Sequence, residues 1–191
     1  MRRIDALTVL AELTGRLPVV VTCAASSREL AAVADRPNHL YLLDSMGLAG
    51  SVATGLALAL ADSPVSKVVT IEGDGSLLMN PNVLPTGGYL APHKLLLVLL
   101  DNGVYGATAN LPTYADRVDL GAFAQAAGWT VSEARDRDEL RAGFAAALVA
   151  DGPVFLHVRI EPGNAAEVPK LLADPVVLAR RFQDWLAGAG R

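Results

Sequence analysis

The sequence predicts an α/β fold, a doubly wound sheet of about six mostly parallel strands with helices on both faces. Short apolar runs alternate along the chain with segments of helical spacing, which is the pattern of strand–helix–strand units. Just over half of the residues are hydrophobic, so a chain of 191 residues can bury a substantial core. Because no internal repeat interrupts the pattern, we expect a single domain over residues 1–191.

Six runs rich in leucine or β-branched residues are the expected strands. Most are bounded by glycine, proline or aspartate, which are rare inside strands. Their apolar residues are continuous rather than alternating, as is typical of parallel strands buried on both faces. The six runs are Pro18–Thr22, His39–Leu43, Lys67–Glu72, Lys94–Asp101, Thr130–Glu133 and Pro153–Ile160.

The segments between these runs are amphipathic or rich in alanine and are the expected crossover helices. One of them carries small residues on nearly every face, which allows a cofactor or another subunit to approach its backbone closely. A further helix over residues 174–188, beginning at Asp174-Pro175, is expected to close the fold or to dock a partner. The crossover helices are Ile4–Thr14, Ser27–Ala34, the small-residue segment Gly47–Ala61, Leu120–Ala127 and Arg137–Ala150.

The composition argues against several classes of function. The net charge of −4, the absence of a basic stripe and the few aromatic residues disfavour a nucleic-acid partner. No run of about eighteen uncharged apolar residues occurs, and Met1-Arg2-Arg3 leads into Asp5 rather than into an apolar leader. We therefore expect a cytoplasmic protein without a membrane segment. The single cysteine, Cys23, follows an apolar run and is expected to be a small core residue.

Other polar residues are interpreted structurally. His39 and His157 lie at or within expected strands and His93 precedes one, and the three lack the spacing of metal ligands. Lys94 and Arg117 could attract an anion, yet a surface position is the simpler interpretation of both.

The most informative polar residues follow two consecutive predicted strands. Gly73-Asp74-Gly75-Ser76 ends the first, and Asp101-Asn102-Gly103-Val104-Tyr105-Gly106 ends the second. In doubly wound sheets, ligands bind outside the carboxyl ends of the strands. Asp74 and Asn102 could each offer an oxygen to one magnesium ion, while the glycines let the backbone approach a phosphate. The sequence therefore predicts a site for a metal-bound diphosphate.

This paired motif resembles that of the thiamine diphosphate enzymes, which begins with Gly-Asp-Gly and ends in Asn. The resemblance implies that Mg²⁺ is held by Asp74, the Asn102 side chain and the Val104 backbone carbonyl. It also implies contacts between thiamine diphosphate and five further residues of the motif: Gly73, Gly75, Ser76, Tyr105 and Gly106.

The resemblance extends to the segment before the small-residue helix. Met46 matches a large apolar residue that, in this family, wedges the cofactor into its bent shape. The backbone at Asp44 and Met46 is expected to bond the pyrimidine ring, and Ser45 belongs to the same cofactor-binding segment.

Within this family, roughly residues 15 to 160 resemble sulfopyruvate decarboxylase β subunits and the corresponding half of phosphonopyruvate decarboxylases. That similarity implies a carboxy-lyase subunit acting on a short 2-oxo acid that bears a sulfonate or phosphonate. The similar segments outside the motifs already quoted are Ser27-Arg28-Glu29-Leu30, Asp35-Arg36-Pro37, Leu77-Leu78-Met79-Asn80 and Arg117-Val118-Asp119-Leu120.

The resemblance also implies a partner. Enzymes of this type need a glutamate, carried on a separate pyrimidine-binding domain, to activate the cofactor, and this chain has room for only one such domain. We therefore expect a pyrimidine-binding α subunit to supply the glutamate in an α2β2 or larger hetero-oligomer. No catalytic residue is assigned to the present chain.

Two departures from the family pattern leave other functions open. Asp44 stands where relatives usually have glycine, and residues 107–113 replace a loop richer in glycine and glutamine. A non-catalytic or divergent thiamine diphosphate-binding subunit is one alternative. Subunits of an acetolactate synthase-like enzyme or of a 2-oxo acid oxidoreductase are others, although the latter typically carry cluster-binding cysteines, which Cys23 alone cannot replace.

Overall fold

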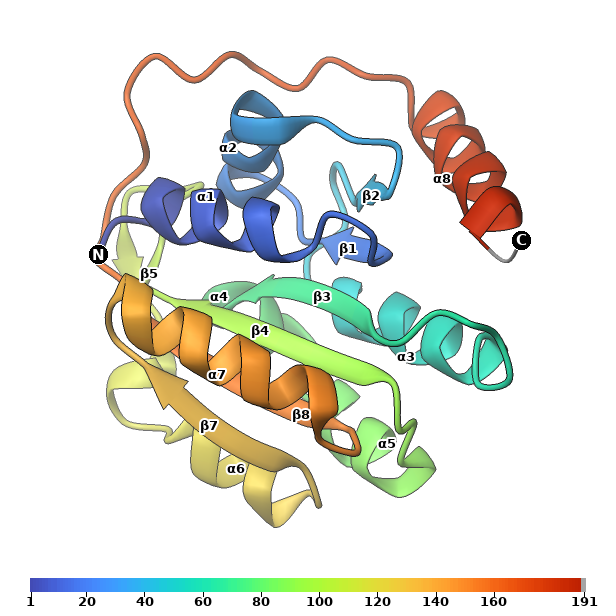
Figure 1. The fold of residues 1–191 in the computed structure, drawn as a ribbon. Coiled ribbons are helices and arrows are strands. Elements are labelled where there is room, and N and C mark those ends of the chain that lie inside the picture. Colours follow the sequence, from blue (N-terminus) through green and yellow to red (C-terminus); the bar gives the residue numbers. More distant parts are fainter. Residues whose placement is uncertain (190–191) are drawn as a thin grey trace.

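The computed structural model describes residues 1–189, in which six parallel strands form one sheet (Figure 1). All six predicted strands are present and pair in the order β2-β1-β3-β4-β8-β7, so the predicted fold class is confirmed. The strands are β1 (Val19–Val21), β2 (His39–Tyr41), β3 (Val68–Gly73), β4 (Leu95–Asp101), β7 (Thr130–Ala134) and β8 (Val154–Arg159).

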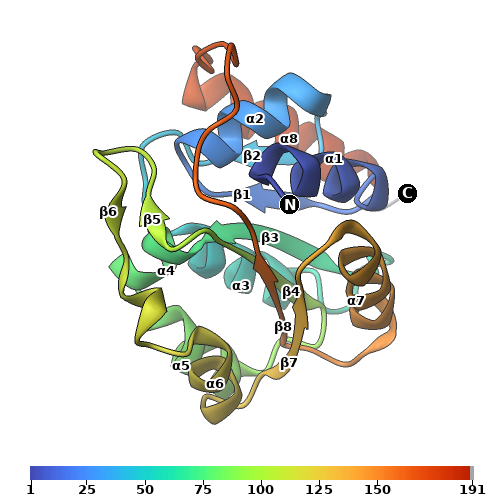
Figure 2. The same ribbon diagram turned by 90° about the vertical axis from the view of Figure 1, so that its left-hand side faces the viewer.

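Helices cover both faces of the sheet, as Figure 2 shows for α1 and α2 on one side and α3, α5 and α6 on the other. A crossover from one parallel strand to the next needs such a helix, and each helix buries its apolar side against the sheet. The first face carries α1 (Arg3–Leu13), α2 (Ala25–Ala34) and α7 (Arg137–Val149), and the second carries α3 (Ala49–Ala59), α4 (Asp74–Met79), α5 (Val83–Leu90) and α6 (Leu120–Ala126).

Strand β4 shows why the central runs are continuously apolar. Leu96, Val98 and Leu100 pack into the core on the side of α1 and α7, because alternate side chains point to the same face. The intervening Leu95, Leu97 and Leu99 pack against α3 and α5 on the other side. With helices on both faces, every residue of this strand is buried.

The structure contains elements that the periodicity did not predict. The segment that begins within the Gly-Asp-Gly motif forms α4 and α5, and Asp74 is the first residue of α4 rather than part of a simple turn. Pro81 lies between these helices and Pro85 lies in the first turn of α5, where proline's missing N–H costs little. An antiparallel pair, β5 (Val104–Tyr105) and β6 (Leu111–Pro112), precedes a single 3-10 turn, η1 (Tyr114–Asp116).

The predicted terminal helix forms as α8 (Pro175–Ala189) and packs beside β2 at the sheet edge. Arg181 makes two 2.8 Å hydrogen bonds to the Asp35 carboxylate, and Leu178 and Phe182 are buried. Val176 and Val177 are exposed. That α8 docks a partner therefore stays a prediction. Among residues 1–189, no helix has both the length and the apolar character needed to cross a bilayer.

Candidate functional site

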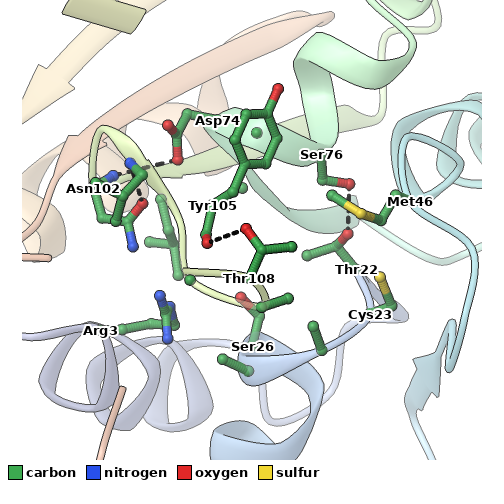
Figure 3. Close-up of a pocket in the computed structure, with 18 residues that line it drawn as sticks. Arg3, Thr22, Cys23, Ser26, Met46, Asp74, Ser76, Asn102, Tyr105 and Thr108 are labelled. Atoms are coloured by element: carbon green, nitrogen blue, oxygen red, sulfur yellow. Dashed lines mark hydrogen bonds between the residues drawn. The ribbon is translucent and has the colours of Figure 1, made fainter. Parts of the chain in front are cut away.

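A small cavity of about 100 Å³ lies at the carboxyl ends of the central strands (Figure 3). Residues 22–26, from the end of β1 into the first turn of α2, form one wall, and the ends of β3 and β4 form others. Strands β3 and β4 pair in parallel register, with Gly73 opposite Leu100, so the residues that follow them emerge side by side. This edge of the sheet is where doubly wound folds place ligands.

Asp74 and Asn102 meet in this cavity. The Asp74 Oδ1 atom accepts a hydrogen bond of 3.3 Å from the backbone N–H of Asn102. Both residues line the cavity, and their exposed fractions are only 2% and 7%. The structure therefore brings together the two residues that the motif spacing singled out.

The Asp74 carboxylate is suited to a cation. Its Oδ2 atom accepts a 2.6 Å hydrogen bond from the Thr113 hydroxyl, but no Lys, Arg or His within residues 1–189 forms an ion pair with it. Burial raises the pKa of Asp74 and the nearby Asp101 carboxylate adds to this effect, while the hydrogen bond from Thr113 opposes it. A buried carboxylate without a cationic partner is costly, and a hard divalent ion would remove that cost.

Two more oxygens lie in the turn after β4. The Asn102 Oδ1 atom accepts a 3.1 Å hydrogen bond from the Val104 N–H, and the Val104 carbonyl accepts one of 3.1 Å from Gly106. Amide and carbonyl oxygens each have two lone pairs, so each retains one for a further partner. Gly103 adopts a positive φ of 70°, which permits this tight turn. The donor set of Asp74, Asn102 and Val104 fits a magnesium ion.

A cluster of polar side chains around the buried Asp101 carboxylate holds the same turn. The Asp101 Oδ2 atom lies 2.7 Å from His157 Nε2 and 2.6 Å from Arg159 Nη1, and its Oδ1 atom accepts from the Gly103 N–H at 3.1 Å. His157 lies within β8 and is fully buried, so the structure gives it the structural position that the sequence predicts. The cluster fixes the backbone from which Asn102 projects.

A close contact with the Tyr105 ring requires glycine at position 75. A Cβ atom there would lie 2.6 Å from two carbons of the Tyr105 ring and 3.3 Å from the Thr113 methyl group. Tyr105 thereby forms one side of the cavity, over the first turn of α4. A Cβ on Gly73 would meet nothing within 4 Å, so the cavity is open on that side.

Ser76 links three segments around the site. Its hydroxyl lies 2.8 Å from Thr22 Oγ1 and accepts a 2.8 Å hydrogen bond from the Gly47 N–H. Gly47 has a positive φ of 76°, and a Cβ atom there would lie 2.8 Å from Asn80 Cβ. Ser76 thus holds the turn that leads from Met46 into α3.

The segment before α3 lies at the boundary of two hollows. Met46 lines the small cavity and is 38% exposed at its mouth. Asp44 and Ser45 instead line an adjoining groove of about 1150 Å³, together with Arg28 and Lys170. Asp44 is exposed there and does not line the small cavity, although its charge is one of the causes that raise the pKa of Cys23 in the cavity wall.

Sequence comparison identifies the family. Residues 22–158 match the family described as "Thiamine pyrophosphate enzyme, C-terminal TPP binding domain". The chain belongs to the thiamine pyrophosphate enzymes. Thiamine pyrophosphate is another name for thiamine diphosphate, so the family resemblance of the paired motif is confirmed. The match includes both halves of that motif and Met46.

Relatives of this thiamine pyrophosphate enzyme include decarboxylases. A sulfopyruvate decarboxylase subunit beta from Methanothermobacter thermautotrophicus is 42% identical, over 99% of this chain and 97% of that one. A phosphonopyruvate decarboxylase from Streptomyces viridochromogenes is 40% identical over 95% of this chain, which spans 45% of that relative. The crystal structure of benzoylformate decarboxylase from Polynucleobacter necessarius superposes with a TM-score of 0.74 at 25% identity, covering 86% of this chain and 34% of that one.

Several residues of the site in this thiamine pyrophosphate enzyme were not predicted. Thr113, which donates to Asp74, lies in a loop without periodicity, and Arg3, which lines the cavity, lies far before the motif in sequence, so neither carried a sequence signal. Cys23 is buried, as expected, but it also lines the cavity, and burial raises the pKa of its thiol. The remaining unpredicted lining residues with polar side chains are Thr22, Ser26 and Thr108.

The surface position expected for both Arg117 and Lys94 is correct for Arg117 and wrong for Lys94. Arg117 is exposed and pairs only loosely with Asp116, at 3.9 Å. Lys94 is 8% exposed, and its Nζ atom donates to the carbonyls of Leu60 at 2.8 Å and Ser63 at 2.7 Å. It therefore caps the carboxyl end of α3 rather than facing solvent.

Acidic side chains other than Asp74 lie outside the cavity wall. Glu72 is buried and accepts a 3.1 Å hydrogen bond from the Gly73 N–H, and burial raises its pKa. None of the residues lining the cavity, within the part of the chain described, is a glutamate. That same part contains no group of three or more His, Cys, Asp or Glu side chains placed to bind a metal.

Proposed function

We propose that the chain is the diphosphate- and metal-binding subunit of a two-subunit, thiamine diphosphate-dependent 2-oxo acid decarboxylase. The observation that carries the proposal is the meeting of Asp74 and Asn102 in one buried cavity. The substrate proposed is a short anionic 2-oxo acid, sulfopyruvate or phosphonopyruvate. The names of the two decarboxylase relatives, one matched over nearly its whole length, support that choice.

In this proposal Asp74, Asn102 and the Val104 carbonyl hold Mg²⁺. Magnesium prefers six oxygens in an octahedron, so three protein oxygens leave positions for phosphate and water. The backbone at Gly73 and Gly75, with Ser76, would receive the diphosphate at the start of α4, while Tyr105 and Gly106 would enclose it. Bound thiamine diphosphate supplies an electron sink for the pair of electrons released when the carboxyl group leaves as carbon dioxide.

The proposal assigns the opposite end of the cofactor to the segment before α3. Met46 lies at the mouth of the cavity, where its side chain would press on the cofactor and set its bend. Backbone groups of residues 44–46 would hydrogen-bond the pyrimidine edge. The position of Asp44 in the adjoining groove is compatible with this role, because its backbone can take part while its carboxylate stays outside the cavity.

A partner subunit would complete the site. No glutamate lines the cavity within residues 1–189, so the acid that activates the cofactor would come from a pyrimidine-binding α subunit. The M. thermautotrophicus relative is named as a beta subunit, and the Streptomyces relative is about twice as long as the matched region. We propose a hetero-oligomer of α2β2 or larger composition.

One surface of the chain fits such a partner. The outward face of α3 carries no charge, and its neighbour Met79 is 62% exposed. A contiguous uncharged face on a helix is typical of a surface that another subunit covers. A Cβ atom added to Gly55 on this face would meet no heavy atom within 4 Å, so partner backbone could approach closely. The face consists of Leu48, Ser51, Val52, Gly55, Leu58 and Ala59.

The test is reconstitution. The chain is co-purified with the product of a neighbouring pyrimidine-domain gene, supplied with thiamine diphosphate and Mg²⁺, and assayed for aldehyde release from sulfopyruvate, phosphonopyruvate and pyruvate. We expect activity of the complex on an anionic substrate and none from either subunit alone. Full turnover by the isolated chain, or a complex that retains no cofactor, would contradict the proposal.

A further inference from the structure

Arg3 occupies the wall of the cavity although it lies far from the motif in sequence. It is the first residue of α1, is 7% exposed, and lines the cavity together with Asn102 and Gly106. Figure 3 shows its side chain reaching from the helix toward the loop that carries Asn102. Among the cavity-lining residues of the described chain, Arg3 is the single Lys or Arg.

The guanidinium group has unused donors. It carries five N–H bonds, and its two observed hydrogen bonds both come from Nη1, to Glu29 Oε1 at 3.1 Å and to Asn164 Oδ1 at 2.9 Å. Within residues 1–189, neither Nε nor Nη2 donates to a protein acceptor. Neither nitrogen is among the fully buried, unpartnered polar atoms of the described chain, so both keep contact with solvent. They are therefore available to an acceptor that enters the cavity.

The surrounding contacts hold the group in place beside the proposed diphosphate loop. Glu29 is 1% exposed and also accepts a 3.0 Å hydrogen bond from the Ala165 N–H. The Asn164 Nδ2 atom donates to the Gly106 carbonyl at 3.1 Å. The Arg3 Nη2 atom would lie 3.6 Å from a Cβ on Gly106. Two side chains and the loop thus fix the guanidinium before any ligand arrives.

We propose that Arg3 binds a phosphate oxygen of the cofactor, as an anion-binding residue additional to the metal site. This inference rests on the proposed function. A diphosphate carries more negative charge than one magnesium ion neutralises, and Asp74 adds another negative charge to the same cavity. A guanidinium presents a planar fork of donors that matches phosphate oxygens. The sulfonate or phosphonate of the substrate has the same oxyanion chemistry, so the experiment must distinguish the two sources.

The experiment measures binding in the co-purified complex of the chain with its partner. Arg3→Gln should raise the Kd for thiamine diphosphate and for magnesium pyrophosphate by similar factors, about tenfold to a hundredfold, because it removes a charge-assisted hydrogen bond. The two Kd values of Arg3→Lys should lie between those of Arg3→Gln and those of wild type. Arg117→Gln, which removes an exposed guanidinium, should leave both constants unchanged. The KM for sulfopyruvate, measured with saturating cofactor, should not move.

A second variant separates binding from folding. Arg3→Gln leaves Glu29 buried and unpaired, whereas Arg3→Gln/Glu29→Gln removes both charges and should recover part of the lost melting temperature. The double variant should still bind magnesium pyrophosphate more weakly than wild type does. Wild-type affinity in the double variant would overturn the inference, and so would a raised KM for sulfopyruvate with an unchanged cofactor Kd. A wild-type complex that binds no thiamine diphosphate would instead overturn the proposed function, and this assignment with it.

Discussion

Thr113→Val tests how much the Asp74 carboxylate depends on its single hydroxyl donor. The substitution keeps the shape of the side chain and removes the O–H that lies 2.6 Å from Asp74 Oδ2. A hydrogen bond to a buried charged group contributes about 1.5–3 kcal/mol. We therefore expect the free energy of unfolding of the metal-free protein to fall by about 2 kcal/mol, which corresponds to a melting temperature lower by roughly 4–8 °C for a chain of this size.

The pH dependence of this loss has a definite sign. The hydrogen bond from Thr113 lowers the pKa of Asp74, so its stabilisation is present when the carboxylate is ionised and disappears as the pH falls through the pKa of the folded protein. Urea unfolding of wild type, Thr113→Val and Thr113→Ser, followed at several pH values, measures this. The valine variant should lose most at high pH, and the serine variant should resemble wild type. Equal stability of the valine and serine variants, or a loss independent of pH, would refute the reasoning.

Three further substitutions have expected outcomes. Asp74→Asn should raise the melting temperature of the metal-free protein at neutral pH, because it removes a buried charge. It should also abolish the rise in melting temperature that Mg²⁺ with thiamine diphosphate produces. A ligand-induced rise that the variant retains in thermal melts would contradict this. Gly75→Ala should weaken cofactor binding about tenfold in calorimetry, because its Cβ atom would lie 2.6 Å from the Tyr105 ring. Adding Tyr105→Ala to this variant should restore part of the lost affinity. No recovery in the double variant would argue against this contact. Lys94→Met should lower the free energy of unfolding by about 2 kcal/mol through loss of the bonds to Leu60 and Ser63, whereas Lys170→Met, at an exposed position, should not.

The elements that the sequence predicted are those fixed by burial. Strands such as Lys94–Asp101 are apolar on both faces because helices cover both, so their pattern is visible without the structure. The meeting of Asp74 and Asn102 also follows from topology, since each residue directly follows one of two adjacent parallel strands. In contrast, α4 and α5 are too short to show helical periodicity, and α5 also contains Pro85.

The unpredicted parts of the site depend on contacts between distant segments. Thr113 reaches Asp74 only because the β5–β6 pair folds back over the start of α4. Arg3 reaches the cavity because α1 packs on α2, where the Glu29 carboxylate accepts a hydrogen bond from the Arg3 guanidinium. The sequence around Lys94 indicates a surface residue, but the end of α3 and the turn after it provide carbonyl acceptors for its ammonium group. No local pattern specifies such contacts.

The metal site is tested most directly by a crystal structure of the complex grown with Mn²⁺ and thiamine diphosphate, using the anomalous scattering of manganese. The account predicts one manganese ion bound by the Asp74 carboxylate, the Asn102 side-chain oxygen and the Val104 carbonyl, with phosphate oxygens completing its coordination. A manganese peak elsewhere in the complex, or a cofactor whose diphosphate lies away from Asp74, would contradict it.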